Sequence, residues 1–203
     1  DPFTAFLLGF AMAVSNARMR ENENGTLLGK IEINIQPKAR RPLIIGVIAI
    51  ALGLSAMPVL SALSDGYYAA AGGPINEGSE LLALKGKMLD RAEALNPFDA
   101  RIPFAIANID SVTGRKDKTI RNYKRAAALN PVKGEHMQNL GLAYYETGDK
   151  ETAGKYMKLG LQHDPTSAWM RKNYALWLFS TGEKKAAMAE MQMAIILDPV
   201  NTR

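Results

Sequence analysis

Few side chains in this 203-residue sequence are of the types that carry out catalysis or hold metal ions. The only histidines, His136 and His163, stand 27 residues apart without companions at a metal-ligand spacing. Cysteine is absent, which excludes disulfides, Cys-ligated zinc and thiol catalysis. The sequence also lacks a nucleophile elbow, a phosphate-binding loop and a dinucleotide fingerprint. We therefore expect no catalytic residue, metal or cofactor in this chain, and binding is the chemistry to look for.

Charge argues against nucleic acid as the partner. The chain has 25 Lys and Arg against 20 Asp and Glu, a net charge of +5. A nucleic-acid-binding protein usually carries a clustered basic stripe, whereas the densest basic cluster here borders a hydrophobic segment. The ten methionines, where they fall in the second half of the chain, have helical core spacing and indicate packing.

The element that would position a binding surface is a repeat with a period of 34 residues. Prolines mark one end of each unit, at Pro97, Pro131, Pro165 and Pro199, and glycines mark the middle, at Gly114, Gly148 and Gly182. A fixed period of this length indicates a repeat architecture. Glycine permits the left-handed backbone that ends a first helix, and Asn or Asp before proline ends a second one. Two helices and two turns fill the 34 residues.

These units resemble the tetratricopeptide repeat (TPR). Its small residues recur at matching places, at Ala107, Gly141 and Ala175 in the first helices and at Ala126, Gly160 and Ala194 in the second. The segment 139–149, NLGLAYYETGD, is similar to the family pattern almost throughout. The resemblance implies an all-α fold, a right-handed superhelix of antiparallel helix pairs. We delimit three full units, 100–133, 134–167 and 168–201 within 100–203, preceded at 65–99 by a hinge (Ala69–Gly78) and a degenerate unit.

In TPR arrays the first helix of each unit lines a concave face. The resemblance therefore implies these ligand-facing residues: Arg101, Phe104, Asn108, Gln138, Asn139, Leu142, Tyr145, Trp169, Lys172, Asn173, Leu176 and Phe179. Aromatic rings supply contact area and amides orient hydrogen bonds, a mixture that suits an extended peptide of a protein partner or a glycan.

A hydrophobic segment precedes the repeats. Residues 43–64 run for 22 residues without a charge, and at about 1.5 Å per residue a helix of this length spans roughly 30 Å of hydrocarbon. A buried core helix rarely runs so long without a polar face. We therefore predict a transmembrane helix, kinked at Pro58, and the lipid bilayer as a partner.

Basic residues give this helix an orientation. Six Lys and Arg lie in the loop 16–42, whereas none follows the span closely. The positive-inside rule then places this loop in the cytoplasm and everything after residue 65 on the periplasmic or extracytoplasmic side of the inner (cytoplasmic) membrane. Residues 3–14 are apolar but too few to span a bilayer, and we interpret residues 1–15 as the remnant of an earlier transmembrane helix whose start is missing.

A final transmembrane pair followed by extracytoplasmic TPR units is similar to the C-terminal region of O-antigen ligase and polymerase-like membrane glycosyltransferases. The first ten residues, DPFTAFLLGF, are similar to the start of a late transmembrane helix in that family. The family's catalytic residues would lie upstream of Asp1, so the resemblance implies the accessory end of a glycan-transferring enzyme. The alternative is a stand-alone anchored adaptor for envelope assembly or biogenesis. Whether the chain is part of an enzyme, and its oligomeric state, stay open.

Overall fold

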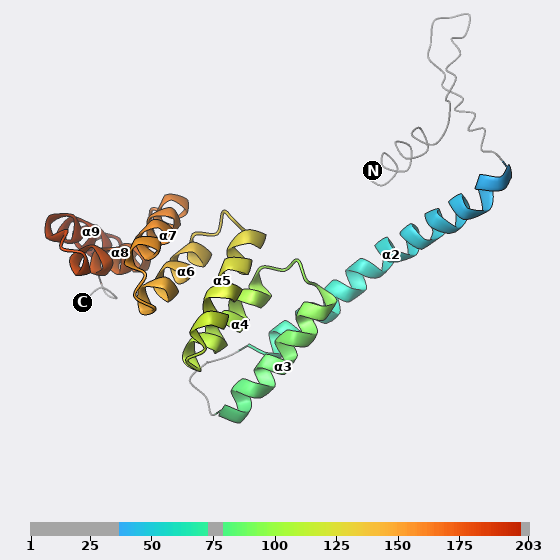
Figure 1. Ribbon diagram of the computed structural model, residues 1–203, viewed down its shortest axis with the longest axis horizontal. Helices are drawn as coiled ribbons and strands as arrows, with labels where there is room; N and C mark the ends of the chain where they lie inside the picture. Colours follow the sequence, from blue (N-terminus) through green and yellow to red (C-terminus); the bar gives the residue numbers. More distant parts are fainter. Residues whose placement is uncertain (1–36, 73–78, 200–203) are drawn as a thin grey trace, which may run out of the picture. The chain divides into compact units, whose positions relative to one another are not determined.

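The structure is a computed structural model that describes residues 37–72 and 79–199 (Figure 1). All regular structure in these two ranges is α-helical, which confirms the predicted all-α class. The helices are α2 (Pro37–Ala70), α3 (Ser79–Leu95), α4 (Arg101–Val112), α5 (Lys116–Leu129), α6 (Gly134–Glu146), α7 (Lys150–His163), α8 (Ala168–Ser180) and α9 (Lys184–Leu197). The chain divides into two compact units, Asp1–Pro58 and Val59–Arg203, and each is described by itself.

The first unit contributes the N-terminal part of α2. The expected remnant at 1–15 and most of the loop 16–42 lie outside the described residues, whereas residues 37–42 already belong to α2. The stretch Ile45–Ala70, which contains a window of 18 residues with a mean hydropathy of 2.1, is long and apolar enough to cross a membrane. Large apolar side chains such as Leu52 and Met57 are exposed along it. The helix continues through Pro58.

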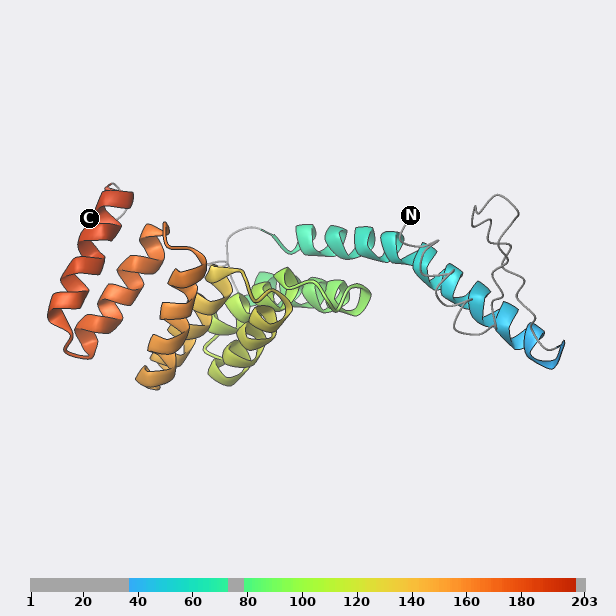
Figure 2. The same ribbon diagram turned by 90° about the horizontal axis from the view of Figure 1, so that it is seen from above.

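The second unit is built from successive helix pairs, α4–α5, α6–α7 and α8–α9. The two helices of each pair run side by side in opposite directions (Figure 2). The turns within the pairs contain Gly114, Gly148 and Gly182, with φ of 72°, 88° and 92°. This left-handed backbone is open to glycine without a steric penalty, as the repeat pattern predicted. The helix bounds fall inside the three predicted repeat units.

Small residues allow the paired helices to approach closely. Ala107, Ala126 and Ala194 are completely buried. A Cβ atom built on Gly141 would lie 2.7 Å from Met157 Cγ and 3.0 Å from the Ala153 carbonyl oxygen. Helix packing of this kind leaves no room for a larger side chain, so these positions serve the core as the resemblance implied.

The last part of α2 forms the first helix of the degenerate repeat. In the second unit, the Ser64 hydroxyl donates to the Ala92 carbonyl oxygen of α3 at 2.9 Å, and the Arg91 guanidinium lies 5.7 Å from the centroid of the Tyr67 ring. Tyr67 and Tyr68 pack against a core cluster that includes Leu89 and Ile102. The prediction of a non-helical hinge from Ala69 onward is therefore wrong at its start, because these contacts extend the helix to residue 70. Residues 73–78 lie outside the described residues.

Candidate functional site

A cleft of about 560 Å³ is shared by the first helices of the three repeats. Four predicted ligand-facing residues line it: Phe104 and Asn108 from α4, Asn139 from α6 and Trp169 from α8. Its remaining walls include the turns that precede α6 and α8. The structure thus brings together, at one site, residues that lie up to two repeats apart in the sequence.

The amides of this concave cleft are held by neighbouring groups. The Tyr123 hydroxyl donates to Asn108 Oδ1 at 2.5 Å, and Asn139 Nδ2 donates to the Glu135 carbonyl oxygen at 2.9 Å. Burial raises the pKa of Tyr123 to about 12, so its hydroxyl stays protonated and remains a donor at neutral pH. Because this bond engages the amide oxygen of Asn108, a ligand in the cleft would meet its amino group.

The aromatic residues of the cleft differ in exposure. Trp169 is 44% exposed, which leaves much of its ring for contact with a ligand. Phe104 is half-buried, and its ring centroid lies 5.5 Å from that of Tyr123 and 4.9 Å from that of His136. Trp169 is therefore the main apolar anchor that the cleft offers.

Charges of both signs line the cleft. They are the cation of Lys133 and the carboxylates of Glu135 and Asp164, and Lys133 Nζ lies 3.8 Å from Glu135 Oε2. Recognition there would depend on ring contact and amide hydrogen bonds more than on the net charge of the ligand.

Other predicted ligand-facing residues lie on the same first helices but outside the cleft. Tyr145, Leu176 and Phe179 are exposed, whereas three more are half-buried: Leu142, Lys172 and Asn173. The amide nitrogen of Asn173 is itself buried and has no hydrogen-bond partner within 37–72 and 79–199.

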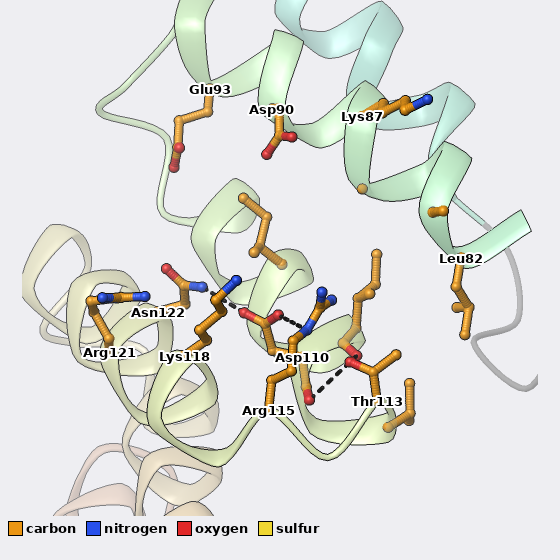
Figure 3. A pocket seen from close by; sticks show the side chains of 15 residues that line it. Leu82, Lys87, Asp90, Glu93, Asp110, Thr113, Arg115, Lys118, Arg121 and Asn122 are labelled. Carbon is orange, nitrogen blue, oxygen red and sulfur yellow. Dashed lines mark hydrogen bonds and ion pairs between the residues drawn. The ribbon is translucent and has the colours of Figure 1, made fainter. Parts of the chain in front are cut away.

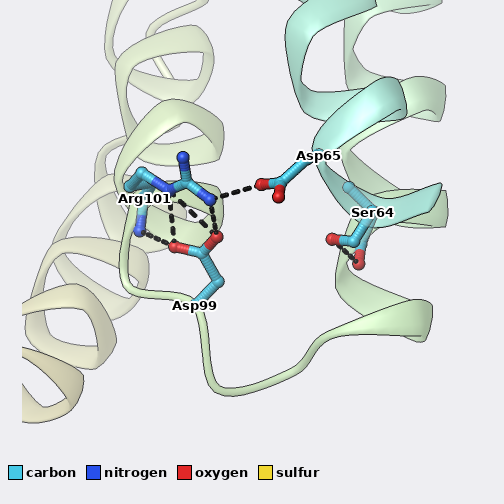
Figure 4. Close-up of polar contacts among 5 residues, drawn as sticks. Ser64, Asp65, Asp99 and Arg101 are labelled. Atoms are coloured by element: carbon cyan, nitrogen blue, oxygen red, sulfur yellow. Dashed lines mark hydrogen bonds and ion pairs between the residues drawn. The ribbon is translucent and has the colours of Figure 1, made fainter. Parts of the chain in front are cut away.

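Gln138 and Arg101 require correction. Gln138 is fully buried, and its Oε1 would lie 3.3 Å from a Cβ built on Gly160, so it contacts α7 instead of facing a ligand. Arg101 is exposed, but its guanidinium forms ion pairs with Asp65 and Asp99, both at 2.5 Å (Figure 4). It ties α4 to the end of α2, and no part of it lines the concave cleft.

A second, charged cleft of about 740 Å³ lies between α3, α4 and α5 (Figure 3). The carboxylate of Asp110 is buried at its base and accepts hydrogen bonds from Arg115 Nε and Asn122 Nδ2, both at 2.8 Å. These bonds join α4 to α5. This arrangement was not predicted from the sequence. The signal that could have indicated it is Asp110 itself, a single carboxylate next to apolar residues near the end of α4.

His136 packs in the interior of the repeats and joins α6 to α5. It is buried, and its Nδ1 lies 3.2 Å from the Ala126 carbonyl oxygen, to which it donates in the neutral ring. Burial lowers the pKa of His136 below its ordinary value, although Glu135 nearby opposes this shift. Within the described residues, no group of three or more His, Cys, Asp or Glu side chains could hold a metal ion.

We expect acid to destabilise the repeats through His136. The unfolded chain binds a proton at about pH 6.5, whereas the buried ring resists it, so stability is complete above that pH and falls as the pH drops toward the folded pKa. His136→Phe should therefore flatten the fall in melting temperature between about pH 7.5 and pH 5.5. Circular dichroism melting curves would measure this, and parallel curves for both proteins would assign the acid sensitivity to other groups.

The comparisons with known proteins identify the fold. No protein-family model and no curated protein matches the chain. One crystal structure of MamA is similar with a TM-score of 0.56 and 19% identity, covering 83% of this chain and 97% of that one. Another, of MamA protein, has a TM-score of 0.55 and 17% identity, covering 74% and 77%. In the APC/C hetero-tetramer Cut9–Hcn1, a chain matches with a TM-score of 0.55 and 17% identity, covering 60% of this chain and 25% of that one.

MamA and Cut9 are TPR-type helical repeat proteins. The fold of this chain is a TPR-type helical repeat. At these identities the likeness concerns the fold alone.

Proposed function

We propose that this chain is a membrane-anchored TPR module that binds an extended segment of a protein partner outside the cytoplasm. The observation that carries the proposal is the concave cleft, in which Trp169, Asn108 and Asn139 come from three successive repeats. A ligand that touches all three must be elongated along the array. An extended polypeptide fits this requirement, because its side chains can pack on Trp169 while its backbone bonds to the amides.

Anchoring is supported by α2. A helical stretch of 26 mostly apolar residues, Ile45–Ala70, with exposed large side chains suits a lipid environment better than water. The basic loop before it supports an extracytoplasmic location for the repeats.

We expect Trp169→Ala to abolish partner capture. Loss of a central aromatic anchor commonly costs about 2 kcal/mol or more, roughly a 30-fold weaker affinity. The measurement is photo-crosslinking in native membranes, with benzoylphenylalanine in place of Phe104 and with Trp169 either kept or replaced by Ala. The crosslinked product should disappear in the Ala variant, while helicity stays unchanged because Trp169 is already 44% exposed.

Phe179→Ala is the matched control. Phe179 is an aromatic residue of the same helix, 64% exposed, and does not line the cleft. It should leave the crosslink intact. Equal loss in both variants would contradict the concave cleft as the binding site and would point to the wider face of α8.

A glycan is the second candidate ligand, in an O-antigen ligase or polymerase-like membrane protein of which this chain would be the accessory end. What supports it is the order of elements, an apolar helix followed directly by repeats, together with the similarity of residues 1–10, which lie outside the described residues. An antibody against the repeats would decide by immunoblot. A native product well above 22.1 kDa with many hydrophobic spans upstream would favour the ligase, and a product near that mass would favour a stand-alone adaptor.

A further inference from the structure

Two charge-free segments, far apart in the sequence, end at the same level of the second unit. The first is the end of the span in α2, where Asp65 is the first charged residue after Ser64. The second is the stretch Ala94–Phe98, which comprises the last two residues of α3 and the turn that follows, and is bounded by Glu93 and Asp99. The sequence alone gives no reason to relate them.

Two contacts bring them into register (Figure 4). The Ser64 hydroxyl donates to the Ala92 carbonyl oxygen at 2.9 Å, which fixes the last residue of the charge-free span beside the last turn of α3. One residue further on, Asp65 shares the Arg101 guanidinium with Asp99. The first charges that follow the two segments, both carboxylates, are therefore bound by the same guanidinium.

Most of the exposed side chains at this level are apolar. Phe98 is 77% exposed, and Pro97 before it is exposed as well. On α2, Leu60 and Leu63 are 39% and 51% exposed. Both segments thus present mainly apolar side chains and no charge of their own. A neighbouring cation is Arg125 of α5, whose side chain is 40% exposed, donates to the Pro97 carbonyl oxygen at 3.4 Å and pairs with Glu93. An arginine beside apolar side chains suits the headgroup level of a membrane.

We propose that the stretch Ala94–Phe98, the end of α3 and the turn after it, lies at the headgroup level of the bilayer, with the Phe98 ring in the membrane interface. This inference rests on the proposed anchoring by α2. A charge-free span from Leu43 to Ser64 is about 33 Å long and fills the hydrocarbon layer up to Ser64. The register then carries the turn to the same depth, where aromatic rings are favoured.

The consequence is a restraint on the repeat array. A helix that continued freely above the membrane would let the repeats tumble, whereas a second contact at Phe98 fixes which edge faces the lipid. The edge opposite contains the glycine turns within the helix pairs, for example at Thr147 and Gly148. These turns would point into the aqueous phase.

Single cysteines can test this depth because the natural chain has none. Three variants of the full chain, Leu52→Cys, Phe98→Cys and Thr147→Cys, are labelled with the fluorophore NBD and reconstituted in phosphatidylcholine and phosphatidylglycerol vesicles. All three side chains are exposed, so the labels should not disturb the fold, and circular dichroism would check this. Quenching by lipids with a nitroxide near the headgroup or deep in the acyl chain then reports the depth of each label.

We expect the label at position 52 to be quenched most by the nitroxide deep in the acyl chain. The label at position 98 should be quenched most by the nitroxide near the headgroup, several-fold more strongly than the label at position 147, which should be quenched little. Quenching at Leu52 with Phe98 no different from Thr147 would overturn the membrane-facing turn and leave the anchor intact. Absence of quenching at Leu52 would instead refute the anchoring itself, and the inference with it. Equal strong quenching at Phe98 and Thr147 would also refute an edge-specific contact.

Discussion

Gly141→Leu should lower the melting temperature of the repeat array by roughly 10 °C. A Cβ atom at this position would already lie 2.7 Å from Met157 Cγ and 3.0 Å from Met157 N, and leucine adds three more carbon atoms. Overpacking of a tight core commonly costs about 1–3 kcal/mol, and here α6 and α7 must separate because backbone atoms are in the way. A cost near 3 kcal/mol corresponds to about 6–12 °C for a chain of this size.

Gly86→Leu is the matched control for that result. Gly86 also lies inside a helix, α3, but a Cβ built there meets no heavy atom within 4 Å. Removing a glycine from a helix should by itself stabilise it by about 0.5–1 kcal/mol. Far-ultraviolet circular dichroism of both variants in detergent micelles measures the difference. If the Gly141→Leu protein had the same melting temperature as the wild type, Gly141 would not set the spacing of α6 and α7.

The repeat could be predicted because its signals are local. A left-handed glycine such as Gly148 and a helix-ending pair such as Asp164-Pro165 act within one turn of chain. Their effect does not depend on distant residues, so the helix pairs fall within the units predicted from the period alone. The small residue at Gly141 is similar, because the close contact it allows is with the partner helix of its own repeat.

Burial of individual residues on the first helices could not be predicted in the same way. Phe104, Gln138 and Lys172 occupy the same position in three repeats, yet only Gln138 is completely buried. Gly160 of the partner helix explains why Gln138 is buried. A Cβ atom on Gly160 would lie 3.3 Å from the Gln138 amide oxygen, and the other two repeats have an alanine at the position of Gly160. One missing methyl group in the partner helix thus turns a predicted ligand contact into a core residue.

The limits of α2 illustrate a second kind of ambiguity. Hydropathy identifies apolar residues but does not distinguish lipid from protein as their surroundings. Ser64 and Tyr67 lie at the end of one continuous helix, and only their contacts with α3 show that this end belongs to the repeats. The predicted hinge was placed too early for this reason.

Gly154→Ala should be the second most damaging substitution, because one methyl group meets a fixed indole ring. A Cβ on Gly154 would lie 2.1 Å from Cζ2 of Trp177. The ring is held by a hydrogen bond from its Nε1 to the Lys150 carbonyl oxygen at 2.8 Å and by a stacked contact with Tyr174, with centroids 5.4 Å apart. To admit the methyl group, Trp177 must give up these contacts or α7 and α8 must move apart. We expect a loss of about 1–3 kcal/mol.

A double-variant cycle tests this mechanism. In a Trp177→Leu background the ring is absent, so Gly154→Ala should cost much less than it does with Trp177 present, with a coupling of about 1 kcal/mol or more. Gly86→Ala, which meets no neighbour, should cost nothing in either background. In a Trp169→Phe background the remaining indole fluorescence comes from Trp177 alone, and Gly154→Ala should shift its emission to longer wavelength as the ring becomes hydrated. An equal loss of stability from Gly154→Ala in both backgrounds would mean that the Trp177 ring moves aside without strain. The contact between the second and third repeats would then not depend on the hydrogen bond and the stacking that hold Trp177.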